Sequence, residues 1–216
     1  MLTVSLLGGE SSGKSTLAQQ LHVALQALGI HSLLVHEHLR EWCEAAGRAP
    51  QAHEQTAIAA EQTRRIESAR AEVVIADTTA LMVAAYSELY FNDRGLWADA
   101  LAAQRRLGLT LLMGLDLPWV SDGFLRDSPA VREATDAVLR RELQGAGIGF
   151  HTLYGQGTQR LAAALRAVGT ALGRELLPDD PLLRDGSGHW QCEACSDPDC
   201  EHRLFSALLA RRGGGG

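Results

Sequence analysis

A glycine-rich stretch near the start of the chain has the residue spacing of a phosphate-binding loop. Residues 8–15 read GGESSGKS, which fits G-x-x-x-x-G-K-[ST], and the stretch follows an apolar run and opens a helical pattern, as this motif requires. Glycines let successive backbone N–H groups turn toward phosphate oxygens, and the helix start adds positive potential. We therefore predict that nine residues cradle nucleotide phosphates: Gly8, Gly9, Glu10, Ser11, Ser12, Gly13, Lys14, Ser15 and Thr16.

The lysine of this motif is the single lysine of the chain. Among 20 basic residues, the other 19 are arginine. An ammonium is a compact point charge that fits between phosphate groups, whereas a guanidinium is planar and forked. Lysine at position 14 in a chain that otherwise uses arginine supports a nucleotide phosphate site independently of the motif match.

A phosphate-binding loop of this kind works with Mg²⁺, which is held by the hydroxyl after the lysine and by an acid at a neighbouring strand end. Ser15 supplies the hydroxyl. Asp77, directly after the apolar run EVVIA, is the first candidate for the acid, and Asp116, after the next apolar run, is the second. Asp77 also suits the N-cap of the helix that follows, and one residue can fill both roles.

A second group of chemistry-bearing residues lies near the carboxyl end. Cys192, Cys195, Cys200 and His202 form the pattern C-x₂-C-x₄-C-x-H, which supplies three thiolates and an imidazole for tetrahedral Zn²⁺. Because this set leaves no open position, we expect a structural zinc. A redox cysteine pair is the alternative, although that pair belongs at a strand–helix junction. Docking on a lid, dimerisation and binding of a protein partner remain open as roles of this tail.

The elements that must position these residues alternate between strands and helices. Apolar runs predict strands at residues 2–7, 32–36, 72–76, 109–115 and 148–154. Helical periodicity follows at residues 14–28, 39–46, 50–71, 79–91, 94–108, 130–144 and 159–172. Such strands are typical of a parallel sheet covered on both faces. We therefore predict an α/β fold: a three-layer P-loop NTPase sandwich with a five-stranded, mainly parallel sheet in residues 1–175, followed by a Cys/His tail in residues 176–216.

Composition restricts the partners. The net charge is −6 and no basic stripe is visible, which argues against a nucleic-acid partner. We find no signal-peptide pattern and no apolar run near the about 20 residues that cross a bilayer, so we expect a cytoplasmic protein without a membrane partner. With one asparagine, Asn92, and one lysine, the chain cannot supply the guanine-reading motif of GTPases. A small-molecule kinase with a lid after the fourth strand suits the length best.

Four stretches resemble, in the same order, the ribosylnicotinamide kinase domain of NadR-like bacterial proteins: GGESSGKSTL, VHEHLREW, IADTTALMVAAYSELYF and LDLPWVSDGFLRD. The resemblance extends from about residue 4 to residue 166 and leaves out the tail. It implies a nucleoside-kinase type of sheet, with ATP and Mg²⁺ as cofactors. It also implies transfer of a phosphoryl group to the 5′-hydroxyl of nicotinamide riboside, which gives nicotinamide mononucleotide.

The catalytic roles follow from phosphoryl-transfer chemistry together with this resemblance. Lys14 and the loop backbone would bind the phosphates, and Arg126 would close over them to neutralise charge. The resemblance favours Glu37 beside the acceptor hydroxyl, with Arg40 next to it, and Asp77 is the other carboxylate at the same sheet edge.

The predicted substrate site contains Glu37 and Arg40 together with Trp42, Thr79, Trp119 and Asp122. Aromatic faces would suit a cationic nicotinamide ring, and Tyr86 and Tyr90 are further candidates. These two tyrosines are four residues apart on one predicted helix, which favours core packing for the pair.

Three departures from the family keep two alternatives open. Residues 77–79 read Asp-Thr-Thr where the family often has Asp-Thr-Asp, and the lid arginine, Arg126, is displaced from its usual place after Gly123. The nucleotidyl-transfer motif of the multifunctional relatives is absent from the sequence. A kinase for another nucleoside-like alcohol, and an ATP-binding regulatory module that reads a protein partner, are therefore the competing interpretations.

Overall fold

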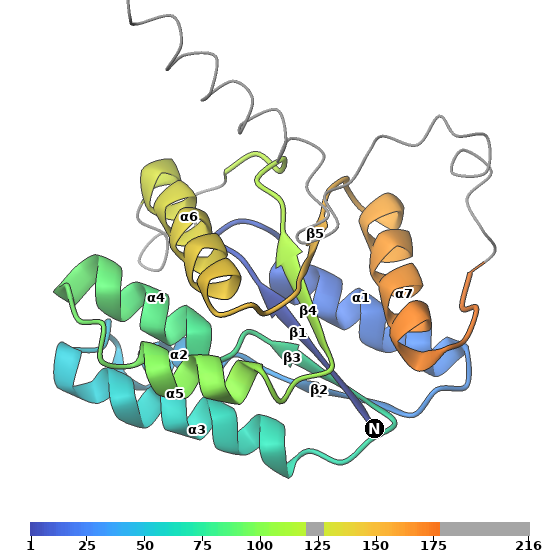
Figure 1. The fold of residues 1–216 in the computed structure, drawn as a ribbon, viewed down its shortest axis with the longest axis horizontal. Coiled ribbons are helices and arrows are strands. Elements are labelled where there is room, and N and C mark those ends of the chain that lie inside the picture. Colours follow the sequence, from blue (N-terminus) through green and yellow to red (C-terminus); the bar gives the residue numbers. More distant parts are fainter. Residues whose placement is uncertain (120–127, 178–216) are drawn as a thin grey trace, which may run out of the picture.

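The computed structural model describes residues 1–119 and 128–177, which form three layers around one parallel sheet (Figure 1). The strands are β1 (Leu2–Leu7), β2 (Ser32–Val35), β3 (Val73–Asp77), β4 (Leu109–Met113) and β5 (His151–Leu153). Their order is β2-β3-β1-β4-β5, and every neighbouring pair is parallel. The predicted α/β fold with a five-stranded sheet is confirmed.

Helices connect these strands. They are α1 (Lys14–Ala27), α2 (His38–Ala46), α3 (Gln55–Ser68), α4 (Ala80–Phe91), α5 (Trp97–Gln104), α6 (Pro129–Gly145) and α7 (Thr158–Leu172), and a 3₁₀ turn, η1 (Ala52–Glu54), precedes α3. None of the helices in the described part of the chain is long and apolar enough to span a membrane.

Several elements are shorter than the sequence predicts, and two of them have a clear local reason at their start. The helix expected from residue 50 begins at Gln55, because Glu54 accepts a hydrogen bond from the Gln51 N–H at 2.7 Å and caps the 3₁₀ turn instead. The strand expected from residue 148 begins at His151, because the Ile148 N–H still bonds to the Leu143 carbonyl of α6 at 2.9 Å.

Alternate side chains of the central strand enter two different cores. On β1, Val4 and Leu6 pack against α1 and α7, whereas Leu7 packs on the opposite face, where residues of α3, α4, α5 and α6 form the second core. All three side chains are fully buried. Helices on both faces explain why the strands are apolar at nearly every position.

The sheet brings the predicted chemistry to one edge. Because all pairs are parallel, the residues that follow β1, β2, β3 and β4 leave the sheet on the same side. The strand order also changes direction at β1, since β3 lies on one side of it and β4 on the other. Open α/β sheets bind their ligands in the crevice at this switch point.

Candidate active site

The loop between β1 and α1 is shaped by two glycines that no other residue could replace without strain. Gly13, directly before α1, has φ 80°, in the left-handed region that favours glycine. Gly9 lies against α6, where an added Cβ would come within 2.7 Å of the Arg132 carbonyl oxygen. The backbone therefore curls over the end of β1 in the way that a phosphate cradle requires.

The Lys14 side chain folds back over this loop. Its Nζ donates hydrogen bonds to the carbonyl oxygens of Gly8, at 2.7 Å, and Gly9, at 3.1 Å. Burial lowers the pKa of the Lys14 ammonium, and the nearby carboxylates of Glu37 and Asp77 oppose this change. The single lysine thus lies between the loop and two acids.

Arg160 on α7 braces the loop from behind. Its Nη1 donates to the Ser12 carbonyl oxygen at 2.7 Å, and its Nη2 forms an ion pair with Asp116, which also accepts from the Gly155 N–H at 2.6 Å. Both Asp116 carboxylate oxygens are therefore engaged. The interpretation of Asp116 as a second candidate for the magnesium acid is not supported, because this carboxylate orients Arg160.

A second buried arginine holds the chain that follows β4. Arg132 on α6 is 7% exposed and donates to the carbonyl oxygens of Leu117, at 2.8 Å, and Leu115, at 2.6 Å. The same residue restricts position 9 of the loop to glycine. Sequence reasoning missed both arginines, although each stands among apolar residues of an amphipathic helix, where a charge signals a specific partner.

Asp77 ends β3 beside the loop, in register with Leu6 of β1. It is 3% exposed, and its buried Oδ1 accepts no hydrogen bond from any described residue. A buried carboxylate oxygen needs a partner, and the Ser15 hydroxyl lies exposed at the first turn of α1. Hydroxyl and carboxylate oxygens are ligands that Mg²⁺ prefers, so Ser15 and Asp77 fit a magnesium site.

Glu37 stands at the start of α2, immediately beyond β2. Its side chain is 14% exposed and pairs with Arg40 at 3.7 Å. Burial raises the pKa of the Glu37 carboxyl, the Lys14 charge lowers it, and the Asp77 carboxylate raises it again. A carboxyl whose pKa is raised next to a cation is suited to accept a proton during a reaction.

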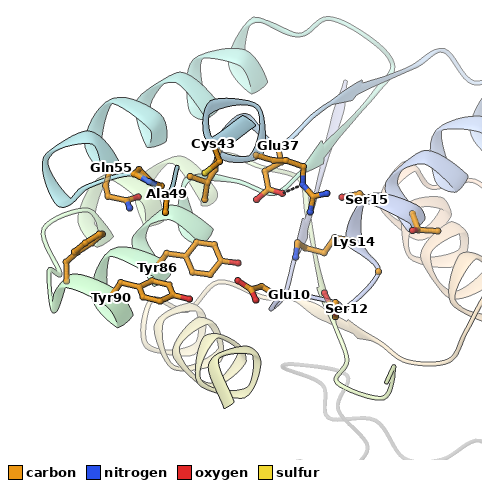
Figure 2. Close-up of a pocket in the computed structure, with 17 residues that line it drawn as sticks. Glu10, Ser12, Lys14, Ser15, Glu37, Cys43, Ala49, Gln55, Tyr86 and Tyr90 are labelled. Atoms are coloured by element: carbon orange, nitrogen blue, oxygen red, sulfur yellow. Dashed lines mark ion pairs between the residues drawn. The ribbon is translucent and has the colours of Figure 1, made fainter. Parts of the chain in front are cut away.

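A cavity of about 580 Å³ extends from the phosphate loop past Glu37 (Figure 2). Figure 2 shows Tyr86 and Tyr90 of α4 along one side, with their hydroxyl groups directed toward the loop. Their rings are tilted by 44°, with centroids 6.1 Å apart, and Tyr90 is 46% exposed. The preference for core packing is thus confirmed only in part: Tyr86 packs against the second core, and both residues line the cavity.

Part of the cavity lining was not anticipated from the sequence. Five such residues come from α2, the segment before α3, α3 and α4: Cys43, Ala49, Pro50, Gln55 and Phe91. They share no motif, and only the packing of these elements brings them together. The cavity has the volume and the mixed aromatic and polar lining of a small-molecule site.

Three residues of the predicted substrate site do not line this cavity. The Trp42 ring lies under the Arg48 guanidinium, 5.0 Å from it. Thr79 donates its hydroxyl hydrogen to Gln104 Oε1 at 2.9 Å and caps α4, so its side chain points away from the cavity. The Trp119 indole nitrogen is buried and bonds to none of the described residues.

The remaining predicted residues lie outside the described residues. They are Asp122 and Arg126 of the expected lid, and Cys192, Cys195, Cys200 and His202 of the expected zinc site. Within residues 1–119 and 128–177, no group of three or more histidine, cysteine or acidic side chains could hold a metal ion. The lid and the zinc site stay predictions from the sequence.

Comparisons with known proteins agree with this architecture. A family model described as an AAA domain matches residues 3–160. A search of curated protein sequences finds no match.

Three solved structures are similar in fold. A crystal structure of NadR protein in complex with NR has a TM-score of 0.69 and 22% identity, over 83% of this chain and 54% of that chain. NadR protein in complex with NAD and AMP-PNP has a TM-score of 0.63 and 21% identity, over 81% and 50%. Thymidylate kinase from Ehrlichia chaffeensis has a TM-score of 0.57 and 10% identity, over 77% and 98%. The chain spans about half the length of the two NadR chains.

Proposed function

We propose that the chain, which belongs to the AAA domain family, is an ATP-dependent kinase of a nucleoside-like alcohol. One observation carries the proposal. The half-buried Glu37 carboxylate and the Lys14 ammonium line the same cavity as the aromatic side chains of α4. A kinase needs these parts in one cavity, because the acceptor hydroxyl must meet both a proton acceptor and the γ-phosphate.

The loop and Lys14 suit the phosphates of ATP. The backbone N–H groups of the loop and the start of α1 attract negative charge, and Lys14 adds a full positive charge. Ser15 and Asp77 would hold the Mg²⁺ ion, which supplies neutralisation of the phosphate charge when bound. Arg160 keeps the loop in shape through its bond to the Ser12 carbonyl.

Glu37 suits the role of proton acceptor. The acceptor oxygen would attack the γ-phosphorus, the bond from that phosphorus to the β–γ bridging oxygen would break, and ADP would leave. The hydroxyl proton would pass to the Glu37 carboxylate. The Lys14 charge lowers the pKa of the Glu37 carboxyl and so opposes the effect of its burial.

Nicotinamide riboside is the acceptor we favour. Its cationic ring would lie among Tyr86, Tyr90 and Phe91, and Glu37 and Glu10 would supply negative charge in the same cavity. The likeness to a NadR protein crystallised with NR supports this choice at the level of fold. Threonine at position 79, which turns toward Gln104, leaves a kinase for another nucleoside as the alternative.

An assay of acceptor-dependent ADP release tests the proposal. The full chain is incubated with ATP and Mg²⁺ and with single nucleosides, including nicotinamide riboside, nicotinic acid riboside and thymidine, and the product is identified by mass. We expect the mononucleotide of one nucleoside to accumulate with ADP in equal amounts. ATP binding without acceptor-dependent ADP release would refute the kinase proposal and favour a regulatory module. If another tested nucleoside were the only substrate, the kinase proposal would stand and only the identity of the acceptor would change.

A further inference from the structure

Gln62 on α3 bonds to the backbone on both sides of Glu37 and next to Asp77. It is 1% exposed, and its Oε1 accepts a hydrogen bond from the His38 N–H at 2.7 Å. Its Nε2 donates to the carbonyl oxygens of His36 and Thr78, each at 3.4 Å. We infer that Gln62 is a positioning residue that fixes the two carboxylates of the active site relative to each other, an inference that rests on the proposed function.

The three backbone partners account for why a glutamine stands at position 62. They present one N–H donor and two carbonyl acceptors, and a primary amide carries one acceptor oxygen and two N–H donors. Glutamate would place a second acceptor oxygen against the two carbonyl oxygens, where no hydrogen bond can form. An apolar side chain would leave all three backbone groups without this partner. The partners also fix which end of the amide is oxygen.

Beyond the last residue pair of β2 and β3, the Gln62 side chain links the two chains by hydrogen bonds in place of strand pairing. The register of β2 and β3 runs from Ser32 with Val73 to Val35 with Ala76 and stops there. The next residues of the two strands are His36 and Asp77, and beyond them the amide joins the separated chains. It therefore joins the carboxyl ends of β2 and β3, next to the switch point at β1.

The backbone at Thr78 adds a second reason for a clamp at this place. Thr78 has φ 77°, which is unusual for a β-branched residue, and its side chain is 2% exposed. Strained backbone persists where the surroundings determine it. The Thr78 N–H bonds to the Leu6 carbonyl at 3.2 Å and its own carbonyl accepts from Gln62, so both peptide groups of this residue are held.

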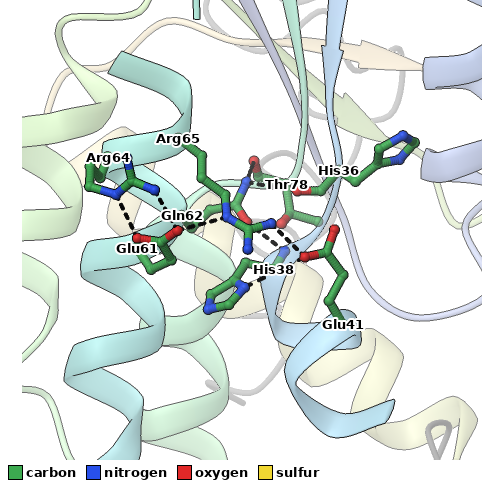
Figure 3. A network of polar contacts seen from close by, with 8 residues as sticks. All are labelled: His36, His38, Glu41, Glu61, Gln62, Arg64, Arg65 and Thr78. Carbon is green, nitrogen blue, oxygen red and sulfur yellow. Dashed lines mark hydrogen bonds and ion pairs between the residues drawn. The ribbon is translucent and has the colours of Figure 1, made fainter. Parts of the chain in front are cut away.

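Charged contacts fasten the start of α2 to the same helix. Figure 3 shows Gln62 between His36, His38 and Thr78, with the Arg65 and Glu41 ion pair beside it. Arg65 also pairs with Glu61 at 2.9 Å, one helical turn away on α3. Because Gln62 on α3 bonds both to the start of α2 and to the end of β3, loss of its amide would free the Glu37 and Asp77 segments to shift relative to each other.

The test compares Gln62→Met with a matched control, Gln104→Met. Gln104 on α5 is also 1% exposed and also makes three hydrogen bonds, to Ser5, Thr79 and Thr110, but it touches neither carboxylate segment at its backbone. Each variant loses the three hydrogen bonds of a buried amide, so thermal denaturation should show similar losses of stability.

Only Gln62→Met should change the chemistry. We expect its kcat to fall about 10- to 100-fold while KM for ATP stays within about threefold, since misplacement of reacting groups costs this much. The Mg²⁺ concentration that gives half-maximal binding of a non-hydrolysable ATP analogue should rise about tenfold, because Asp77 loses its support. Gln104→Met should leave both quantities within about threefold of wild type. Equal changes in the two variants, or none in Gln62→Met, would overturn the inference.

Gln62→Asn keeps the inference testable if Gln62→Met does not fold. Asparagine retains a neutral amide but is one methylene shorter, so it should fold and still lower kcat about tenfold. Wild-type kcat in Gln62→Asn would overturn the inference. If the wild-type chain phosphorylates no acceptor, the proposed function fails, and the Mg²⁺ dependence of analogue binding alone decides the role of Gln62.

Discussion

The two halves of the candidate active site are built in different ways. The phosphate half consists of one continuous loop, and its supports, Arg160 and Arg132, bond to backbone carbonyls. The acceptor half, where we propose that the alcohol binds, consists of side chains from α2, α3 and α4, which line a cavity of about 580 Å³ together with residues 10–16 of the loop. The phosphate half is thus formed by backbone groups, and the acceptor half is formed by side chains.

This difference determines how well each half tolerates substitutions. A loop whose backbone binds phosphate tolerates few residues, since Gly9 is confined by Arg132 and Gly13 by its φ of 80°. A surface of side chains can change its ligand by single substitutions without altering the sheet. We therefore expect substitutions in the phosphate half to abolish turnover and those in the acceptor half to alter the choice or affinity of the acceptor.

The largest effect is expected at Lys14. Lys14→Arg should lower kcat/KM more than about 10³-fold, because the forked guanidinium would occupy the space of the phosphates. Thermal denaturation should show an intact fold, and the matched control Arg64→Lys, at an exposed position of α3, should keep wild-type turnover. Wild-type activity in Lys14→Arg would show that the phosphate half tolerates changes after all.

Glu37 joins the two halves, and its substitution should affect kcat alone. Glu37→Gln removes the proposed proton acceptor but keeps the shape of the side chain, so kcat should fall about 10²-fold or more while KM for ATP changes little. Glu44→Gln, at an exposed position of the same helix, is the matched control. Steady-state kinetics with ADP detection measure both. Unchanged kcat in Glu37→Gln would assign the proton acceptor to another carboxylate.

The pH dependence of turnover sharpens the role of Glu37. Burial raises the pKa of the Glu37 carboxyl above its ordinary value of 4.5, and the base must be ionised to act. Activity should therefore be lost as the pH falls through this raised pKa, at a higher pH than an exposed glutamate would give. A profile of kcat/KM against pH measures the acid limb. Glu37→Gln should abolish the limb from its residual activity, and a limb that persists there would contradict the assignment.

The contrast also explains how much of the molecule could be predicted from the sequence. The loop was predictable because its function needs consecutive residues, and the strands because apolar runs without alternation mark a buried sheet. The acceptor cavity was not predictable from the sequence. Tyr86 and Tyr90 have the spacing of a core pair, and periodicity cannot tell whether the face they share meets a core or a cavity.

Single residues near the strand ends show the same limit. Asp77 and Asp116 both follow buried strands, but only Asp77 keeps a buried oxygen without a partner among the described residues, since Asp116 is paired with Arg160 from the far end of the chain. Thr79 turns toward Gln104, which is 25 residues away. These outcomes depend on long-range contacts that no local pattern encodes.

Arg160 tests whether the loop depends on its brace. Arg160→Met should raise KM for ATP about tenfold and leave KM for the acceptor unchanged, because the Ser12 carbonyl loses its charged donor. The free energy of unfolding should fall by about 1–3 kcal/mol, as expected for breaking a mostly buried contact. Denaturant unfolding measures this loss, with Arg174→Met, an exposed ion pair, as the control. Equal effects on both KM values would mean that the two halves are not independent.

Tyr90 tests the opposite half and should give the smallest effect. Tyr90→Ala should raise KM for the acceptor about 3- to 10-fold, the usual contribution of one aromatic face to a cationic or aromatic ligand, while KM for ATP stays unchanged. Tyr90→Phe keeps the ring and should keep wild-type KM. Because Tyr90 is 46% exposed, neither change should cost much stability. If Tyr90→Ala instead lowers kcat and leaves KM for the acceptor unchanged, the side chains of the acceptor half take part in the reaction as well as in binding. The proposed division of roles between the phosphate half and the acceptor half would then be wrong.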